Sequence, residues 1–133
     1  MNDKLIYKAI ANYFKTKVIN NKGTITSFTP RHITNTILTL HNLKISPRVL
    51  NSRIRNILEK LVDLKLIKIW KKCARGKIYV IDVLDSRNRM LYEIIRTLDI
   101  DDLATFLEKI YRIRNEEQIN KLLQEITKHE FNS

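Results

Sequence analysis

The fold is decided by residues 29–63, which read TPRHITNTILTLHNLKISPRVLNSRIRNILEKLVD. Thr29-Pro30 and Ser46-Pro47 each combine a hydroxyl residue, which can cap the free backbone N–H groups of a helix, with a proline that fits the first helical position. They predict one helix that ends near Leu40 and a second that ends near Asp63. Apolar residues recur at helical spacing on one face of each helix: Ile33, Ile37 and Leu40 in the first, and Leu50, Ile54, Ile57, Leu58 and Leu61 in the second. Residues 41–45 then form a short turn between the two helices.

The segments on either side of this helix pair predict a further helix, a short strand and a β-hairpin. Residues 3–19 show the apolar spacing of a helix, and residues 24–28 alternate as one brief strand. Residues 66–72 and 78–83 alternate as two strands, joined by a turn in which Gly76 can adopt a positive φ. Phe28, Trp70 and Tyr79 are expected to pack in the core or against the hairpin. The predicted fold class is mainly α with a small β-hairpin, that is, α+β.

Charge is distributed unevenly along the 133 residues, whose net charge is +11. Residues 1–83 hold seventeen Lys and Arg against four Asp and Glu, a net +13, whereas residues 84–133 hold eight against ten, a net −2. A basic part joined to a nearly neutral part indicates a polyanion-binding unit with a different segment attached, and a solvated basic surface without a partner is the alternative. We therefore predict a DNA-binding domain in residues 1–83 and a helical extension in residues 84–133.

Other kinds of chemistry have little support in the sequence. No apolar run approaches the ~18 residues of a membrane span, and Met1-Asn2-Asp3-Lys4-Leu5 lacks the pattern of a signal peptide. Cys73 is the single cysteine, as is typical of a cytosolic protein, and the three histidines show no zinc-ligand spacing. The two glycines do not form a glycine-rich phosphate loop. We expect a cytoplasmic, nucleoid-associated protein that is not an enzyme and has no metal or cofactor.

The order helix, strand, helix, helix and hairpin in residues 3–83 resembles the winged helix-turn-helix family of transcription regulators, including the small regulators of archaea and their viruses. Residues 46–55 are similar to the family's recognition helix, residues 58–67 to its exit into the first wing strand, and residues 75–79 to a short wing. The family often has glycine where this chain has Leu64-Lys65, so a different helix ending is expected here. The resemblance implies a winged helix-turn-helix followed by a C-terminal helical extension, and binding to double-stranded DNA.

Two groups of side chains are predicted to contact DNA. Arginine can pair with guanine, asparagine with adenine, and serine with either, so the free face of the 47–63 helix is predicted to read bases in the major groove: Arg48, Asn51, Ser52, Arg55 and Asn56. Cations and polar groups of the preceding helix and the hairpin are predicted to contact the backbone or the minor groove: Thr29, Arg31, Asn35, Lys71, Lys72, Arg75 and Lys77. Glu59 is the one carboxylate on the base-reading face before Asp63, and the crowded hairpin cations repel each other unless an anion lies nearby.

Residues 84–133 carry three helical apolar stripes, with helix starts at Ser86, near Asp99 and at Asn115. These stripes either pack on the first domain or pair with a second copy of the chain. We favour a homodimer, whose two recognition helices would lie about 34 Å apart on a palindromic site. The predicted interface consists of Leu91, Ile95, Leu103, Phe106, Leu107, Ile110, Ile119, Leu122, Leu123 and Ile126.

The leading hypothesis is a sequence-specific transcription regulator that binds double-stranded DNA. One alternative is a chromosome- or replication-associated protein that binds DNA without sequence preference. A second is a winged-helix adaptor whose basic face binds an acidic partner in the transcription or replication machinery. Single-stranded nucleic acid is less favoured, because the sequence shows no platform of aromatic residues on which bases would stack.

Overall fold

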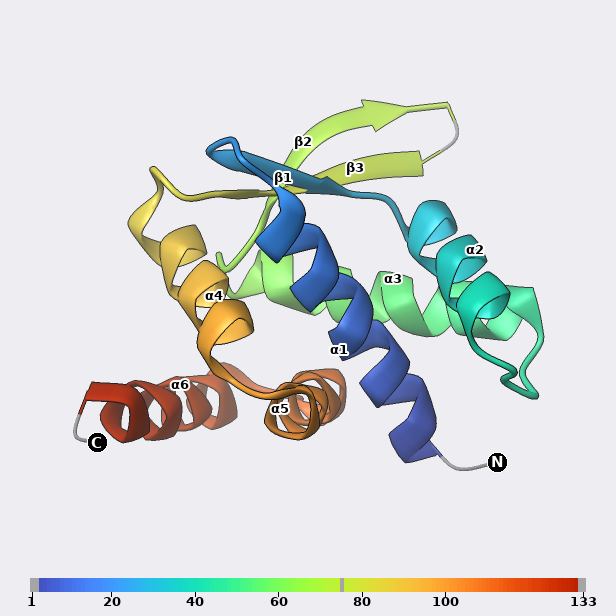
Figure 1. Ribbon diagram of the computed structural model, residues 1–133. Coiled ribbons are helices and arrows are strands. Elements are labelled where there is room, and N and C mark those ends of the chain that lie inside the picture. The colour runs from blue at the N-terminus through green and yellow to red at the C-terminus, as the bar shows by residue number, and fades with distance from the viewer. Residues whose placement is uncertain (1–2, 75, 132–133) are drawn as a thin grey trace.

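The computed structural model describes residues 3–74 and 76–131, without the side chains of residues 116, 119 and 126–131. The chain is mainly helical with a small three-stranded antiparallel sheet, which agrees with the predicted α+β class. In chain order the elements are α1 (Asp3–Asn20), β1 (Ile25–Phe28), α2 (Pro30–Leu40), α3 (Pro47–Asp63), β2 (Lys68–Cys73), β3 (Gly76–Asp82), α4 (Ser86–Thr97), α5 (Ile100–Arg112) and α6 (Glu116–Phe131). Figure 1 shows the helices on one side of the sheet, with the β2–β3 hairpin extending toward the side where α2 and α3 lie.

The helix starts follow local side-chain chemistry. The Thr29 hydroxyl accepts a hydrogen bond from the backbone N–H of His32, and the Ser46 hydroxyl accepts one from Val49, both at 3.2 Å, which confirms the two predicted caps. The predicted start of α4 is wrong by one residue. Its cap is Asp85 rather than Ser86, because the carboxylate accepts two backbone N–H groups of the first turn, at 2.9 and 3.0 Å.

Helix α3 ends in a left-handed turn at a residue other than glycine. Lys65 has a φ of 62°, and its N–H donates to the Val62 carbonyl at 2.9 Å while the N–H of Leu66 donates to the Leu61 carbonyl, also at 2.9 Å. This pair of backbone hydrogen bonds normally accompanies a glycine at the left-handed position. The expectation of a different helix ending is therefore wrong, because the chain forms the same turn with a lysine.

The start of α4 stabilises this turn from the outside. The Nε of Arg87 donates to the carbonyl of Leu64 at 3.0 Å, and the amide of the buried Asn88 donates to the carbonyl of Lys65 at 3.1 Å. The Asn88 amide oxygen accepts the backbone N–H of Asp82 at 3.0 Å. Asn88 thus joins the end of α3 to the end of β3, which fixes where the hairpin leaves the helix.

The sheet has the strand order β1-β3-β2, with both pairs antiparallel. Gly76 adopts a φ of +126° at the hairpin turn, as the sequence predicts. The β2–β3 register shifts between Ile69 and Lys71, so that Trp70 is the extra residue of a β-bulge. The sheet thereby joins the short strand β1 to the hairpin, and its covered face packs on the helices through Phe28 and Tyr79, both 1% exposed.

Two large apolar side chains that we expected to be buried lie at the surface. Trp70 is 65% exposed because the bulge removes it from the regular alternation of β2. Leu40 is 68% exposed because it is the last residue of α2, beyond the part of the helix whose Ile33 and Ile37 enter the core. The expectation of packing is confirmed for Phe28 and Tyr79.

The apolar faces of the C-terminal helices are covered by the chain's own residues. Side chains from both predicted domains form one hydrophobic cluster. The eight described residues that we assigned to a dimer interface are at most 7% exposed: Leu91, Ile95, Leu103, Phe106, Leu107, Ile110, Leu122 and Leu123. The assignment is wrong for these residues, because a side chain buried in its own core cannot also cover a second copy. Ile119 and Ile126 belong to the side chains outside the described part.

Lysines of the N-terminal part also hold the ends of the C-terminal helices. The ammonium of Lys15 donates to the carbonyls of Ile95 at 2.9 Å and Arg96 at 3.1 Å, where α4 ends. The ammonium of Lys60 donates to the carbonyl of Tyr111 near the end of α5. Cations in these places satisfy free carbonyls and favour the negative end of the helix dipole. Residues 84–112 are therefore anchored on α1 and α3.

Candidate nucleic-acid interface

A groove of about 1170 Å³ lies between α2, α3 and the β-hairpin. Seven of the predicted DNA-contacting residues line it: Thr29, Arg31, Asn35, Arg48, Asn51, Arg55 and Lys77. Ser52 and Asn56 lie beside it on α3, and Lys71 and Lys72 are exposed on β2. Arg75 lies outside the described residues. The fold therefore brings predicted contacts from three separate segments to one concave surface, which we call the basic groove.

Helix α3 presents most of its predicted base-reading side chains to solvent. Four of them are exposed: Arg48, Ser52, Arg55 and Asn56. Asn51 is half-buried, and the hydroxyl of Thr34 on α2 forms a 3.3 Å hydrogen bond with its amide oxygen. The single hydroxyl hydrogen of Thr34 is shared with the Pro30 carbonyl, which lies closer, at 2.8 Å. Contact with α2 therefore positions Asn51, whereas the other four side chains extend into solvent.

Two further cations of α3 contact other helices and do not line the basic groove. Arg53 forms a 3.2 Å ion pair with Asp3, and its guanidinium lies 5.6 Å from the centre of the Tyr111 ring. The ammonium of Lys60 lies 5.3 Å from the same ring centre, and desolvation lowers the Lys60 pKa. These contacts join α3 to α1 and α5, so the cations of α3 are divided between positions at the basic groove and positions that hold other helices.

Lys77 is paired with Glu59. Its ammonium lies 2.6 Å from the Glu59 carboxylate, which also accepts a 2.7 Å hydrogen bond from the Tyr79 hydroxyl. The hydrogen bond from Lys77 holds the Glu59 pKa below its usual range, and the bond from Tyr79 adds to this effect. Sequence reasoning placed Lys77 among the DNA contacts and missed this cluster. The signal was present, because the crowded hairpin cations required a nearby anion and Glu59 is the carboxylate on the facing helix.

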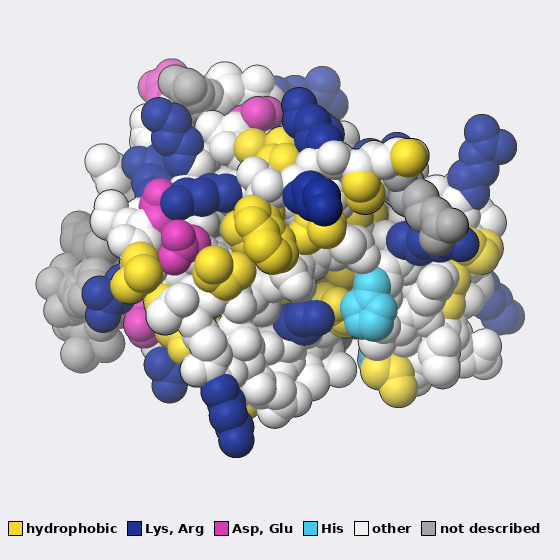
Figure 2. Space-filling model, turned by 90° about the horizontal axis from the view of Figure 1, so that it is seen from above, with side chains coloured by type: hydrophobic (Ala, Val, Ile, Leu, Met, Phe, Trp, Pro, Cys, Tyr) yellow, Lys and Arg dark blue, Asp and Glu magenta, His cyan; other side chains and the backbone are white. Residues whose placement is uncertain are grey.

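Positive charge dominates the basic groove. Of the residues that line it, three arginines and one lysine face a single carboxylate, that of the paired Glu59. Lys71 and Lys72 add exposed charge on the neighbouring strand. Seen from above, the side of the molecule that bears the hairpin and α2 shows Lys and Arg but no acidic side chain (Figure 2). A polyanion would meet an uncompensated positive surface there.

Comparison with known proteins identifies no relative of this chain. No protein-family model, curated protein or solved structure matches this chain. In the part of the chain that the structure describes, no helix combines the length and apolar character needed to cross a membrane. The same residues contain no group of three or more His, Cys, Asp or Glu side chains placed to hold a metal ion.

Proposed function

We propose that this protein binds double-stranded DNA through a winged helix-turn-helix formed by residues 3–83. The observation that carries the proposal is the basic groove, in which seven predicted contacts converge between α2, α3 and the hairpin. The element order α1-β1-α2-α3-β2-β3 and the strand order β1-β3-β2 support the same class. In this proposal α2 and α3 form the helix-turn-helix, α3 is the recognition helix and the hairpin is the wing.

The chemistry of the groove assigns different tasks to its elements. Arg48 and Arg55 on α3 carry guanidinium donors that can pair with guanine in the major groove. Asn51 carries an amide that can pair with adenine. Arg31 on α2 and the exposed lysines of β2 would contact phosphates and set the position of α3 on the duplex. Base contacts from α3 would make the protein sequence-specific, and we propose that it regulates transcription.

Salt dependence gives a first test of this arrangement. Three of the cations that would contact phosphates form no ion pair with a carboxylate in the described structure: Arg31, Lys71 and Lys72. Each phosphate contact contributes about −0.9 to the slope of log K against log salt, so these three contacts predict a slope of about −2.7. Fluorescence anisotropy with a labelled duplex at several salt concentrations measures this slope.

Sequence selection separates the proposed regulator from its alternatives. The experiment selects bound duplexes from a random pool and then compares the selected sites with random duplexes at fixed salt. Arg55→Ala should relax base preference, Lys72→Ala should weaken all duplexes alike, and Lys22→Gln, an exposed lysine that does not line the groove, is the control. A specificity ratio near one would leave a general DNA binder. No duplex binding at low salt would exclude the DNA proposal and favour a protein adaptor.

A further inference from the structure

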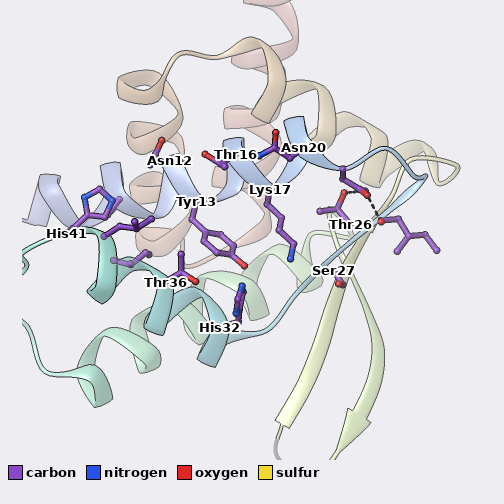
Figure 3. Close-up of a pocket in the computed structure, with 15 residues that line it drawn as sticks. Asn12, Tyr13, Thr16, Lys17, Asn20, Thr26, Ser27, His32, Thr36 and His41 are labelled. Carbon is purple, nitrogen blue, oxygen red and sulfur yellow. Dashed lines mark hydrogen bonds between the residues drawn. The ribbon is translucent and has the colours of Figure 1, made fainter.

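A second groove, of about 460 Å³, lies between α1, β1 and α2. It is separate from the basic groove, and α2 forms a wall of both. His32 and Thr36 of α2 line the second groove, whereas Arg31 and Asn35 line the basic groove. Figure 3 shows Tyr13 and Lys17 extending from α1 toward His32, so polar ends from two helices converge in this space. The volume is within the range of about 300–1,000 Å³ found for small-molecule sites.

The charge of this second groove favours an anion. Lys17 lines it half-buried, and within the described structure its ammonium has no hydrogen-bond or ion-pair partner. No Asp or Glu is among the lining residues. Thr16, Thr36 and His32 supply further polar groups around the same space. A half-buried cation without a counter-ion loses hydration, and a bound anion would restore its electrostatic stabilisation.

The Tyr13 hydroxyl is a second, independent sign of a missing partner. The side chain is only 8% exposed, and its oxygen is a buried polar atom without a hydrogen bond in the described structure. Its ring packs edge-on against His32, with 5.9 Å between ring centres. Burial raises the Tyr13 pKa to about 12, so the hydroxyl keeps its proton at neutral pH and can donate a hydrogen bond. Buried polar groups normally have partners, and a ligand oxygen that enters beside the exposed His32 would supply one.

Apolar side chains occupy the rest of this space. Ile25 is 46% exposed and Leu40 is 68% exposed, and both line the groove together with the buried Ile37 and Ala9. We propose that this groove binds a small organic anion, a carboxylic acid with an apolar body. Its carboxylate lies between Lys17 and the Tyr13 hydroxyl, and its apolar body covers the exposed aliphatic side chains.

The position of α2 gives such a ligand a route to the DNA surface. Thr34 of α2 contacts Asn51 of α3, so a ligand that shifts α2 also shifts one of the predicted base contacts. This regulatory part rests on the proposed DNA-binding function, whereas the anion site does not. Coupling between two sites is typically about 5- to 150-fold in affinity, which is the size of effect expected on DNA binding.

The test uses the full chain and one matched probe pair, 3-phenylpropanoate and its neutral amide, 3-phenylpropanamide. Titration followed by ¹H–¹⁵N NMR should give saturable shifts at residues lining the second groove, with a dissociation constant on the order of millimolar for a ligand of this size. The amide should bind about tenfold more weakly or worse, because it lacks the charge that pairs with the ammonium. Lys17→Gln and Tyr13→Phe should each weaken the binding of 3-phenylpropanoate. Lys22→Gln, which changes a neighbouring exposed lysine, should leave that binding unchanged.

Several results would overturn the proposal. Equal binding of acid and amide would exclude recognition of the anion. Shifts confined to the basic groove around Arg31 would mean that the acid acts there as a nonspecific counter-ion. Anisotropy with duplex DNA at saturating 3-phenylpropanoate tests the coupling, and an unchanged DNA affinity would refute regulation. Failure of the protein to bind any duplex would refute the DNA proposal and leave the NMR result as it stands.

Discussion

Glu59→Gln should strengthen DNA binding even though it removes an ion pair. The wild-type carboxylate neutralises Lys77 across a 2.6 Å contact, with both side chains about one-third exposed, at 35% and 36%. Glutamine keeps an oxygen that can accept the Tyr79 hydroxyl but carries no charge. Lys77 is then free to make one additional phosphate contact in the basic groove. Such a contact adds about −0.9 to the salt slope. Between 1 M and 0.1 M salt, the affinity of the variant should therefore rise about eightfold more than that of the wild type.

The assay is fluorescence anisotropy with one duplex over a series of salt concentrations. Asp63→Asn is the matched control, because it removes one carboxylate from the exposed surface of the same helix without lining the basic groove. It should leave the slope nearly unchanged. An unchanged slope for Glu59→Gln, or weaker binding, would refute the reasoning and show that the pair acts by holding the hairpin against α3. The stability cost should stay below about 1 kcal/mol, because the pair is partly exposed.

Three substitutions test the fold and the Tyr13 site in urea or thermal unfolding. Lys65→Gly should stabilise the protein by about 0.5–1 kcal/mol, because Lys65 has a positive φ that glycine adopts without strain; a loss of stability would contradict the assigned turn. Asn88→Ala should cost about 2–4 kcal/mol, because it leaves the Asp82 N–H and the Lys65 carbonyl without partners; a cost below that of a typical surface substitution would contradict their burial. Tyr13→Phe should stabilise the ligand-free protein by about 1 kcal/mol, because it removes an unpaired buried hydroxyl. Because the Tyr13 pKa rises from 10.0 to about 12 on folding, wild-type stability should fall as the pH rises through this interval, and the Phe variant should lack that component; identical pH profiles would contradict the burial of the hydroxyl.

The predictable part of the fold is the part with local causes. Thr29 and Ser46 cap their helices because a hydroxyl and the N–H groups it accepts are neighbours in the chain. The hairpin turn at Gly76 depends on one residue that tolerates a positive φ. The predicted inner face of α3 is buried for the same reason, since helical spacing places its apolar residues on one side. These features need no knowledge of which element lies next to which.

Features with distant causes were missed or wrongly assigned. The left-handed Lys65 is held by Arg87 and Asn88, more than twenty residues away along the chain. The bulge at Trp70 follows from the register between two strands and not from the composition of either. The apolar stripes of α4 and α5 indicate that these faces must be buried, but they do not indicate which elements cover them. In the structure α1 and α3 cover them. Periodicity therefore predicts that a face is covered without identifying the covering element.

The same distinction applies to charge in the candidate site. The net +13 of residues 1–83 suggested one positive surface, yet the fold gives its cations different partners. Lys15 and Lys60 hold the ends of two helices, Lys77 pairs with Glu59, and Lys17 lines the second groove. The charge available for the proposed DNA contact is therefore smaller than the sequence total. The measured salt slope should follow the number of unpaired cations that contact phosphates, and Glu59→Gln changes that number by one while changing the total charge no more than Asp63→Asn does.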